Sequence, residues 1–328
     1  MTRIRELDAL RGFAVGGIML VNTWQHTDKG ARNAVDWTID ALFQSRFYPI
    51  FSLLFGVSFV LFLRGNSRWA LLSRLFWLFC FGMAQHLFYE GEVLTDYAVY
   101  GAAVLLPASF LSGGLPVLLL GLAAMVWGLQ VGAGPYLIPG LFLVGMGLCR
   151  LRPPRWLLLP SFAVTALAAV LLTAAWASVR TQAGGHTSAQ AWILYSVAAL
   201  AAAAAYSLGL LLILRPQLQA RPQARLSARL SAVLEPLGRM ALTNYVSGTA
   251  VIVLALPLLN ADPTRWSVVA LAALTVAAQV LFSRWWLSRF RYGPLEWIWR
   301  CLTWFRPVPN RLESVRDHNR PLPDPGLT

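Results

Sequence analysis

The sequence contains few charged side chains. Only 12% of its 328 residues are charged, about half of the usual share for a soluble globular protein. Hydrophobic residues make up 57% of the chain, and the mean hydropathy is +0.58. The charged residues are too few to cover the surface of a soluble domain of this length, and so apolar a composition also excludes an intrinsically disordered chain.

Lysine is almost absent, because all but one of the 27 basic residues are arginine. The net charge is +13 and the isoelectric point is near 10.6, but the arginines lie in small groups between long apolar runs and form no single basic face. This distribution excludes a nucleic-acid binder. It is typical of a polytopic membrane protein, in which small basic groups determine the orientation of the helices. We therefore expect the lipid bilayer as a partner and no nucleic acid.

Cysteine and histidine are also scarce. The three cysteines, Cys80, Cys149 and Cys301, provide no disulfide framework, and we interpret them as structural because a buried cysteine behaves as a small hydrophobe. The four histidines lie far apart in the sequence, so no metal-ligand spacing is present. We therefore expect no bound metal.

About ten apolar segments approach the roughly 20 residues that a helix needs to cross a bilayer. The prediction is an all-α fold, a polytopic membrane helix bundle of about ten transmembrane helices. The expected bounds of these helices are 8–26, 47–63, 69–89, 93–111, 115–131, 135–149, 156–178, 190–214, 236–259 and 266–287. Little of the chain is left for an extramembrane domain, so we expect a single transmembrane domain over residues 1–305 and a disordered cytoplasmic tail, rich in proline and charge, over 306–328.

The basic residues concentrate in alternate connections between these segments. Arginines precede the first span, follow the tenth, and cluster between spans two and three, six and seven, and eight and nine. The positive-inside rule then places both termini in the cytoplasm of a bacterial-type inner membrane. The opposite connections, which face outward, contain Asp28, Asp36, Asp40, Glu90, Glu92 and Asp262.

The first span has one polar stripe. Ionisable residues within spans are costly and usually face the interior of a bundle, so they are the best guide to function. Asp8 and Arg11 are three residues apart and can form a structural pair on one helix face. Asn22 lies eleven residues after Arg11, which is close to three helical turns, so it falls on the same face roughly 16 Å further along. The alternative is an arginine that snorkels towards the interface beside a helix-start aspartate.

A second polar group lies at the outer end of the third expected span. Only a few residues separate His86 from Glu92, Asp96 and Tyr97 at the start of the next span, so these side chains can converge on one pocket. A carboxylate beside a histidine orients the ring and stabilises its charged form, which is the standard arrangement for a general base. The alternative is a histidine that is merely hydrogen-bonded inside the bundle.

Two further polar groups lie towards the cytoplasmic end. Arg239 and Asn244 stand near the start of the ninth span, after a basic connection, and Arg74 lies just inside the third. Guanidinium groups match phosphate geometry, so these arginines can hold a polyanion such as coenzyme A; the alternative is a set of anchors that only fix orientation. Near the C-terminus, Glu296 and Arg300 form an i,i+4 pair on an aromatic-rich segment typical of a short interfacial helix.

Segments in order along the chain, from about residue 3 to 305, resemble the YeiB-like family of integral membrane proteins, which carries domain of unknown function 418. The resembling segments are Arg3–Ala14, Gly17–Asn22, Phe51–Gly56, His86–Ala98, Gly238–Tyr245 and Gly293–Trp297. The resemblance implies an acyltransferase-like N-terminal half over residues 1–150 and a YeiB-type C-terminal half over residues 155–305.

The first-span motif of this family is similar to that of membrane acyltransferases, including the heparan-glucosaminide N-acetyltransferase group. In the wider acyltransferase-3 group, an arginine and a histidine stand in the first span with ten residues between them. Here Arg11 has that spacing to Asn22, which moves the candidate histidine to His86 or to His26. Glu92 replaces the aspartate that many members carry after the glycine, and it retains the carboxylate chemistry.

The resemblance and the polar residues together predict a membrane-embedded acyltransferase. Acyl-CoA or acetyl-CoA is the expected donor, bound from the cytoplasm. A glycan or a lipid with a hydroxyl or amine group is the expected acceptor at the outer side. The expected donor-binding residues are Arg11, Arg74 and Arg239. The expected acceptor-binding residues are Asp96, Tyr97 and Asn244.

The expected catalytic residues are His86, Glu92 and Asn22. His86, oriented by Glu92 or Asp96, would remove the acceptor proton during attack on the thioester carbonyl, and Asn22 would donate a hydrogen bond to the oxyanion. A transporter or flippase of a small or lipid-linked substrate is the main alternative, because charged residues within spans also mark permeation paths. A non-enzymatic partner of a membrane complex is another alternative. The sequence is also compatible with a homodimer.

Overall fold

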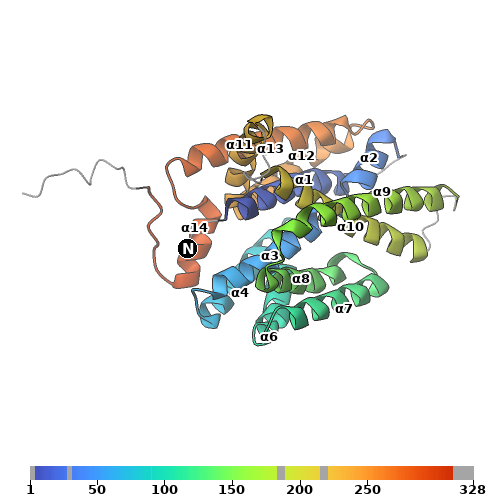
Figure 1. Cartoon of the computed structure of the whole chain (residues 1–328). Helices are drawn as coiled ribbons and strands as arrows, with labels where there is room; N and C mark the ends of the chain where they lie inside the picture. Colours follow the sequence, from blue (N-terminus) through green and yellow to red (C-terminus); the bar gives the residue numbers. More distant parts are fainter. Residues whose placement is uncertain (1–3, 28–31, 90, 183–188, 215–220, 313–328) are drawn as a thin grey trace, which may run out of the picture.

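The computed structural model describes residues 4–27, 32–89, 91–182, 189–214 and 221–312. Within these residues the regular secondary structure is helical, apart from one isolated antiparallel bridge between Phe290 and Arg311. The all-α prediction is therefore confirmed. Figure 1 shows long helices packed side by side, with the N-terminal helix α1 among the C-terminal helices α11, α12 and α13.

The helices follow the apolar segments of the sequence. In chain order they are α1 (Arg5–Gln25), α2 (Ala34–Leu42), α3 (Phe47–Leu63), α4 (Arg68–His86), α5 (Leu94–Tyr100), α6 (Leu106–Ala108), α7 (Leu115–Val131), α8 (Ile138–Leu151), α9 (Leu158–Gln182), α10 (Ala189–Leu214), α11 (Arg221–Arg239), α12 (Ala241–Asn260), α13 (Trp266–Leu287) and α14 (Pro294–Trp304). A π-helical turn over Gly101–Leu105 joins α5 to α6, so these two helices run as one apolar segment.

Six helical segments of the described chain are long and apolar enough to cross a membrane. They are Ala34–Leu63, Gly134–Leu151, Arg155–Arg180, Ala189–Leu214, Ala241–Asn260 and Trp266–Leu287. On α9 the large apolar side chains of Val164, Leu167 and Val170 are all exposed. Exposed apolar surface of this extent suits contact with lipid, so the chain is a multi-pass helical membrane protein.

Helix α1 contacts α3, α10, α11, α12 and α13. Its closest approach is the crossing with α11, where Gly12 faces Leu234 and Gly238 faces Asp8. A Cβ atom on either glycine would overlap a backbone carbonyl of the other helix, so only glycine permits this approach. The crossing fixes the charged start of α1 against the end of α11.

An aromatic core joins α3, α5 and α8. The rings of Phe55 and Phe142 stack with their centroids 4.7 Å apart, and the Tyr97 ring packs edge-on against both, at 5.3 and 5.1 Å. The Tyr97 hydroxyl lies 2.6 Å from the hydroxyl of Ser52 on α3. Aromatic packing and this buried hydrogen bond together hold α5 against α3.

Two helices lie in segments that the sequence predicted to be connections. Helix α2 occupies the acidic segment after α1, and α11 occupies the basic segment before the ninth expected span. Aspartates interrupt the apolar sequence of α2 and arginines that of α11, and α11 packs against α1 and α13. The predicted span 236–259 is therefore corrected: it begins at Ala241, after a break at Met240 (φ −112°, ψ 34°).

Residues 306–312 correct the expectation of a disordered tail that starts at residue 306. The backbone N–H of Arg291 donates to the carbonyl of Asn310 at 2.7 Å, and the N–H of Leu312 donates to the carbonyl of Arg289 at 3.0 Å. This pairing satisfies backbone groups that follow α13. The rest of the expected tail, residues 313–328, lies outside the described residues.

Candidate functional site

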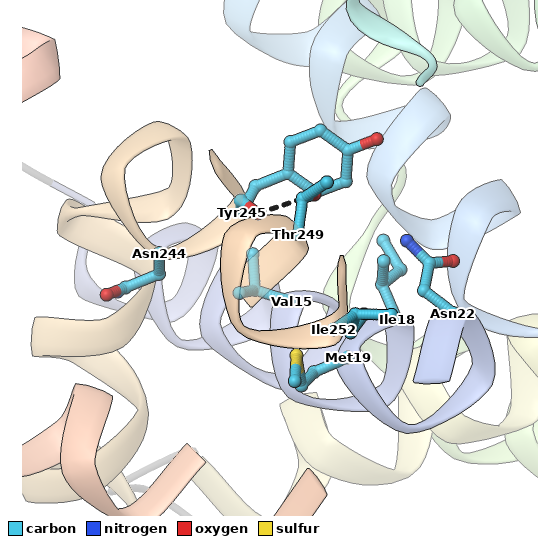
Figure 2. Close-up of a pocket in the computed structure, with 8 residues that line it drawn as sticks. All are labelled: Val15, Ile18, Met19, Asn22, Asn244, Tyr245, Thr249 and Ile252. Carbon is cyan, nitrogen blue, oxygen red and sulfur yellow. Dashed lines mark hydrogen bonds between the residues drawn. The ribbon is translucent and has the colours of Figure 1, made fainter. Parts of the chain in front are cut away.

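Asn22, from the polar stripe of α1, lines a small pocket between α1 and α12 (Figure 2). Val15, Ile18 and Asn22 recur three or four residues apart, so they share one face of α1. They meet Tyr245 and Thr249 of α12. The cavity has a volume of about 10 Å³, which accommodates about one water molecule. The face of α1 that carries Asn22 therefore points into the bundle.

Hydrogen bonds from α4 and from the start of α5 hold two of the side chains that line the pocket. Gln85 Nε2 donates to the Thr249 hydroxyl at 2.9 Å, and the backbone N–H of Val93 donates to the Tyr245 hydroxyl at 3.3 Å. Gln85 is buried, and its Oε1 has no hydrogen-bond partner among the described residues. A buried acceptor without a donor costs free energy, so this oxygen favours binding of a ligand or a water that donates to it.

His26 lies one helical turn beyond Asn22, at the end of α1, and is half-buried. Its Nδ1 is 2.9 Å from the backbone oxygen of Asn22 and 3.0 Å from the Tyr89 hydroxyl, and the His26 and Tyr89 ring centroids are 4.3 Å apart. A Cβ atom at Gly91 would stand 3.0 Å from His26 Nε2, so the glycine makes room for the ring. The described residues provide no hydrogen-bond partner for Nε2, so this nitrogen is available to accept or donate a proton.

His86 points away from this site. It is exposed at the end of α4, on the same outward face as the exposed Met83. Among the described residues no ion pair joins it to a carboxylate. Gln85, one residue earlier, faces inward because successive residues of an α-helix differ by about 100°. The predicted convergence of His86 with Glu92 and Asp96 therefore stays a prediction, because the described residues show no ion pair between them.

Glu92 and Asp96 belong to the start of α5. Glu92 Oε2 accepts a hydrogen bond from the backbone N–H of Thr95 at 3.1 Å, and this contact caps the first turn of the helix. Asp96 is half-buried and close enough to Glu92 for electrostatic repulsion between the two carboxylates. The contacts of Glu92 in the described chain therefore stabilise α5 and orient no histidine.

Tyr97 and Asn244, which the sequence predicted to bind the acceptor, are buried in packing contacts. Tyr97 belongs to the aromatic core of α3, α5 and α8. Asn244 Nδ2 donates to the carbonyl of Leu237 at 3.0 Å and to the hydroxyl of Ser283 at 3.2 Å. Figure 2 shows the Asn244 amide directed away from Asn22, so this side chain connects α11, α12 and α13.

The charged start of the α1 stripe contacts α3. The distance from Arg11 Nη1 to Asp8 Oδ1 is 2.9 Å, and Arg11 Nη2 donates to the Ser58 hydroxyl at 2.6 Å. The Asp8 side chain is 7% exposed, whereas that of Arg11 is 27% exposed. The buried carboxylate therefore directs the guanidinium group towards α3.

Arg74 of α4 lies beside α14. Its guanidinium carbon is 3.8 Å from the ring centroid of Trp299 and 5.1 Å from that of Phe62, which are cation–π distances. The Trp299 indole N–H donates to the backbone oxygen of Arg74 at 2.8 Å. Arg239 has a different environment, because its Nη2 donates to the carbonyl of Arg291 at 3.2 Å. The structure thus attaches Arg74 to α14, and Arg239 to the segment after α13.

Glu296 does not form the predicted pair with Arg300. Its carboxylate accepts hydrogen bonds from the backbone N–H groups of Leu242 and Thr243, at 2.8 and 3.0 Å, and from the Thr243 hydroxyl at 2.6 Å. The first N–H groups of a helix lack internal partners, so Glu296 caps α12. Burial raises the pKa of Glu296 above its ordinary value, and these hydrogen bonds oppose the shift. Arg300 lies 4.4 Å from the ring centroid of Tyr292.

Two buried aspartates of α2 form ion pairs that the sequence analysis did not predict. Asp40 Oδ2 is 3.0 Å from both Arg32 Nη1 and Arg180 Nη1. Asp36 Oδ1 is 3.8 Å from Arg265 Nε. These pairs connect α2 to α9 and to the segment before α13. The available signal was the spacing of the two acids, which are four residues apart in a short amphipathic segment.

The two ends of the α1 stripe offer different chemistry. The end at Arg11, near Arg74, offers guanidinium groups, which bind phosphate. The end at Asn22 and His26 offers an amide and an imidazole, which suit hydrogen bonding to an oxyanion and proton transfer. Within the residues that the structure describes, no three His, Cys, Asp or Glu side chains are grouped to hold a metal ion.

Residues 148–306 match the protein family described as "Protein of unknown function (DUF418)". Over 363 aligned residues, 31% are identical to "Uncharacterized 39.9 kDa protein in amylase 3'region" of Bacillus acidopullulyticus, and this alignment covers 96% of the chain and 98% of that protein. A segment of 69 residues is 41% identical to "Uncharacterized protein YeiB" of Escherichia coli strain K12, covering 20% of the chain and 18% of that protein. No solved structure matches the chain significantly.

Proposed function

The chain belongs to the YeiB-like DUF418 family of unknown function, and we propose that it is a membrane-embedded acyltransferase. The donor is acyl-CoA or acetyl-CoA, and the acceptor is a hydroxyl or amine group of a glycan or lipid at the outer side of the membrane. One observation carries this proposal. A single face of α1 holds Arg11 near one end and Asn22 near the other, with His26 one turn beyond.

The stripe on α1 has the form that a long donor requires. Arg11 and His26 are fifteen residues apart, which corresponds to roughly 22 Å along a helix. Coenzyme A carries its phosphates and its thioester at opposite ends of a flexible arm. Phosphates at Arg11 and a thioester at Asn22 therefore fit one ligand, and the apolar side chains of Val15 and Ile18, which lie between them on the same face, line the small pocket beside Asn22.

We assign the general base to His26, because its ring is held and the ring of His86 is exposed. An Nδ1–H that donates to the Asn22 carbonyl leaves Nε2 basic, and Nε2 takes the proton of the acceptor. The acceptor oxygen or nitrogen bonds to the thioester carbon, and the Asn22 amide donates to the resulting oxyanion. When the oxyanion collapses, the C–S bond breaks and the proton on Nε2 passes to the CoA thiolate.

The pocket has to widen for this reaction, because a cavity of about 10 Å³ accommodates one water molecule but no acyl chain. The hydrogen bonds from Gln85 to Thr249 and from Val93 to Tyr245 hold two of its lining side chains in place. Separation of α12 from α4 and α5 would break both bonds. It would also release the Tyr245 hydroxyl and the Gln85 amide as contacts for the acceptor.

In the proposed topology the chain forms about ten transmembrane helices, as the apolar segments predict. Both termini lie in the cytoplasm of a bacterial-type inner membrane. The alternation of basic connections supports this orientation. In this topology Arg11 faces the cytoplasmic supply of CoA, and His26 lies at the opposite end of α1.

Replacement of His26 tests the proposal. Transfer from radiolabelled acetyl-CoA is measured in membranes that contain the wild type, His26→Ala or His86→Ala. We expect His26→Ala to lower the initial rate about 10²- to 10⁴-fold, the usual contribution of a general base. His86→Ala is the matched control and should retain the wild-type rate, because the His86 side chain is exposed and does not line the pocket. A His26→Ala variant that is folded and transfers at the wild-type rate would refute the assignment.

A further inference from the structure

Arg11 and Arg74 reach the same face of α3. Arg11 donates to the Ser58 hydroxyl, and Arg74 lies against the Phe62 ring. Ser58 and Phe62 are four residues apart, so they occupy one face of α3. Two guanidinium groups from α1 and α4 are therefore held close together at this end of the bundle.

Helix α14 carries a third arginine, Arg300, whose guanidinium carbon lies 4.4 Å from the ring centroid of Tyr292. The Arg74 guanidinium covers the ring of Trp299, which is the neighbour of Arg300 in sequence. Arg11 and Arg300 both lie close enough to Arg74 to act on it electrostatically. The hydrogen bond from the Trp299 indole to the Arg74 carbonyl holds α14 against α4. The two helices lie beside each other in Figure 1.

The charge of this cluster is unbalanced. Asp8 pairs with Arg11, but no carboxylate of the described residues forms an ion pair with Arg74 or Arg300. Glu296, which has the spacing to pair with Arg300, caps α12 instead. Like charges that are partly removed from water repel one another, whereas a shared phosphate offers oxygen acceptors to several guanidinium groups at once.

We propose that Arg11, Arg74 and Arg300 bind a phosphate monoester or pyrophosphate group, and that α14 forms one wall of this site. The inference deepens the proposed function, on which it rests for the identity of the donor: Arg300 replaces Arg239 as the third donor-binding arginine. An anionic lipid headgroup offers the same phosphate chemistry, so the experiment separates a soluble source from a lipid source.

The test is a binding measurement on the purified full chain in phosphatidylcholine nanodiscs. We expect coenzyme A and inorganic pyrophosphate to raise the melting temperature, whereas pantetheine, which lacks phosphate, leaves it unchanged. Arg300→Gln should weaken coenzyme A binding about 10- to 100-fold, the range expected for loss of a hydrogen bond between charged groups. Arg300→Lys keeps the charge but not the forked geometry, so its affinity should be intermediate.

Arg289→Gln is the matched control, because Arg289 also lies over an aromatic ring, that of Trp285 at 4.7 Å, but takes no part in the cluster. It should bind coenzyme A as the wild type does. If Arg300→Gln fails to fold, the affinities of Arg300→Lys and the wild type decide the question, and equal values contradict the inference.

The remaining outcomes are distinguishable. Stabilisation by phosphatidylglycerol in the nanodisc but not by coenzyme A, lost in Arg300→Gln, supports the phosphate site and assigns it to a lipid. No stabilisation of the wild type by any phosphate probe, or equal binding by wild type and Arg300→Gln, overturns the inference. Coenzyme A binding without acyl transfer supports the phosphate site and contradicts the proposed acyltransferase function.

Discussion

Replacement of Glu296 by alanine tests whether one carboxylate holds the start of α12. The substitution removes the acceptor of three hydrogen bonds and leaves the N–H groups of Leu242 and Thr243 unpaired. Loss of a helix cap costs about 0.5–2 kcal/mol, and a hydrogen bond to a charged group is worth about 1.5–3 kcal/mol. The three bonds share one half-buried group and do not add independently, so we expect a loss of about 3 kcal/mol of unfolding free energy.

Glu296→Gln separates the hydrogen bonds from the charge. The glutamine oxygen can still accept from Leu242 and Thr243, so we expect a cost of about 1 kcal/mol or less. The two proteins should also differ in pH dependence. Because the folded state raises the pKa of Glu296, wild-type stability should fall as the pH rises from the ordinary glutamate pKa of about 4.3 through the raised value. Glu296→Gln should lack this component.

The measurement is reversible unfolding of the purified proteins in mixed micelles with increasing sodium dodecyl sulfate, followed by circular dichroism. Each variant is compared with the wild type at one pH, and the wild type and Glu296→Gln are then compared across pH. An alanine variant that unfolds at the wild-type midpoint would contradict the reasoning. So would a glutamine variant as unstable as the alanine variant, because the cost would then come from the charge.

Two more substitutions test the packing of α1 and the ion pairs of α2. In the same assay Gly12→Ala should lower the free energy of unfolding by about 2 kcal/mol, because the alanine Cβ would overlap the Leu234 carbonyl. Gly16→Ala on the same helix should unfold as the wild type does, since its Cβ would meet only side chains at 3.9 Å. Asp40→Asn should lower the free energy of unfolding by about 3 kcal/mol, because it leaves the charges of its arginine partners, including Arg180, without their carboxylate. No measurable change in that free energy would show that these ion pairs contribute little.

Helix positions could be predicted well because a helix in lipid satisfies its own backbone and must be apolar along its length. Each expected span lies on a helix, although the ninth begins at Ala241 and not at 236. Helices α2 and α11 escaped prediction because they are amphipathic: α2 buries Asp36 and Asp40 at its apolar contacts, and α11 alternates arginines with leucines. An average hydropathy hides such a pattern, which only a neighbouring helix makes stable.

The site was harder to predict, because in a membrane an apolar pattern does not distinguish the inside from the outside. Helix α4 exposes Phe76, Phe79 and Met83, and this face is as apolar as the one that packs. Lipid solvates both faces equally, so no sequence pattern places Gln85 inward and His86 outward. His26 did have a signal, since it lies one turn after Asn22 on the only polar stripe of the first span.

The outcome at Glu296 shows why local spacing rules fail where a helix starts nearby. An i,i+4 pair of Glu296 and Arg300 is worth about 0.3–0.5 kcal/mol, less than capping the unpaired N–H groups that the break at Met240 creates. The Glu296 carboxylate therefore caps α12. Arg300, which is close enough to Arg74 to act on it electrostatically, forms no ion pair with a carboxylate of the described chain. One consequence is testable: Glu296→Ala, which loosens α14, should weaken phosphate binding along with stability, whereas Glu296→Gln should retain both.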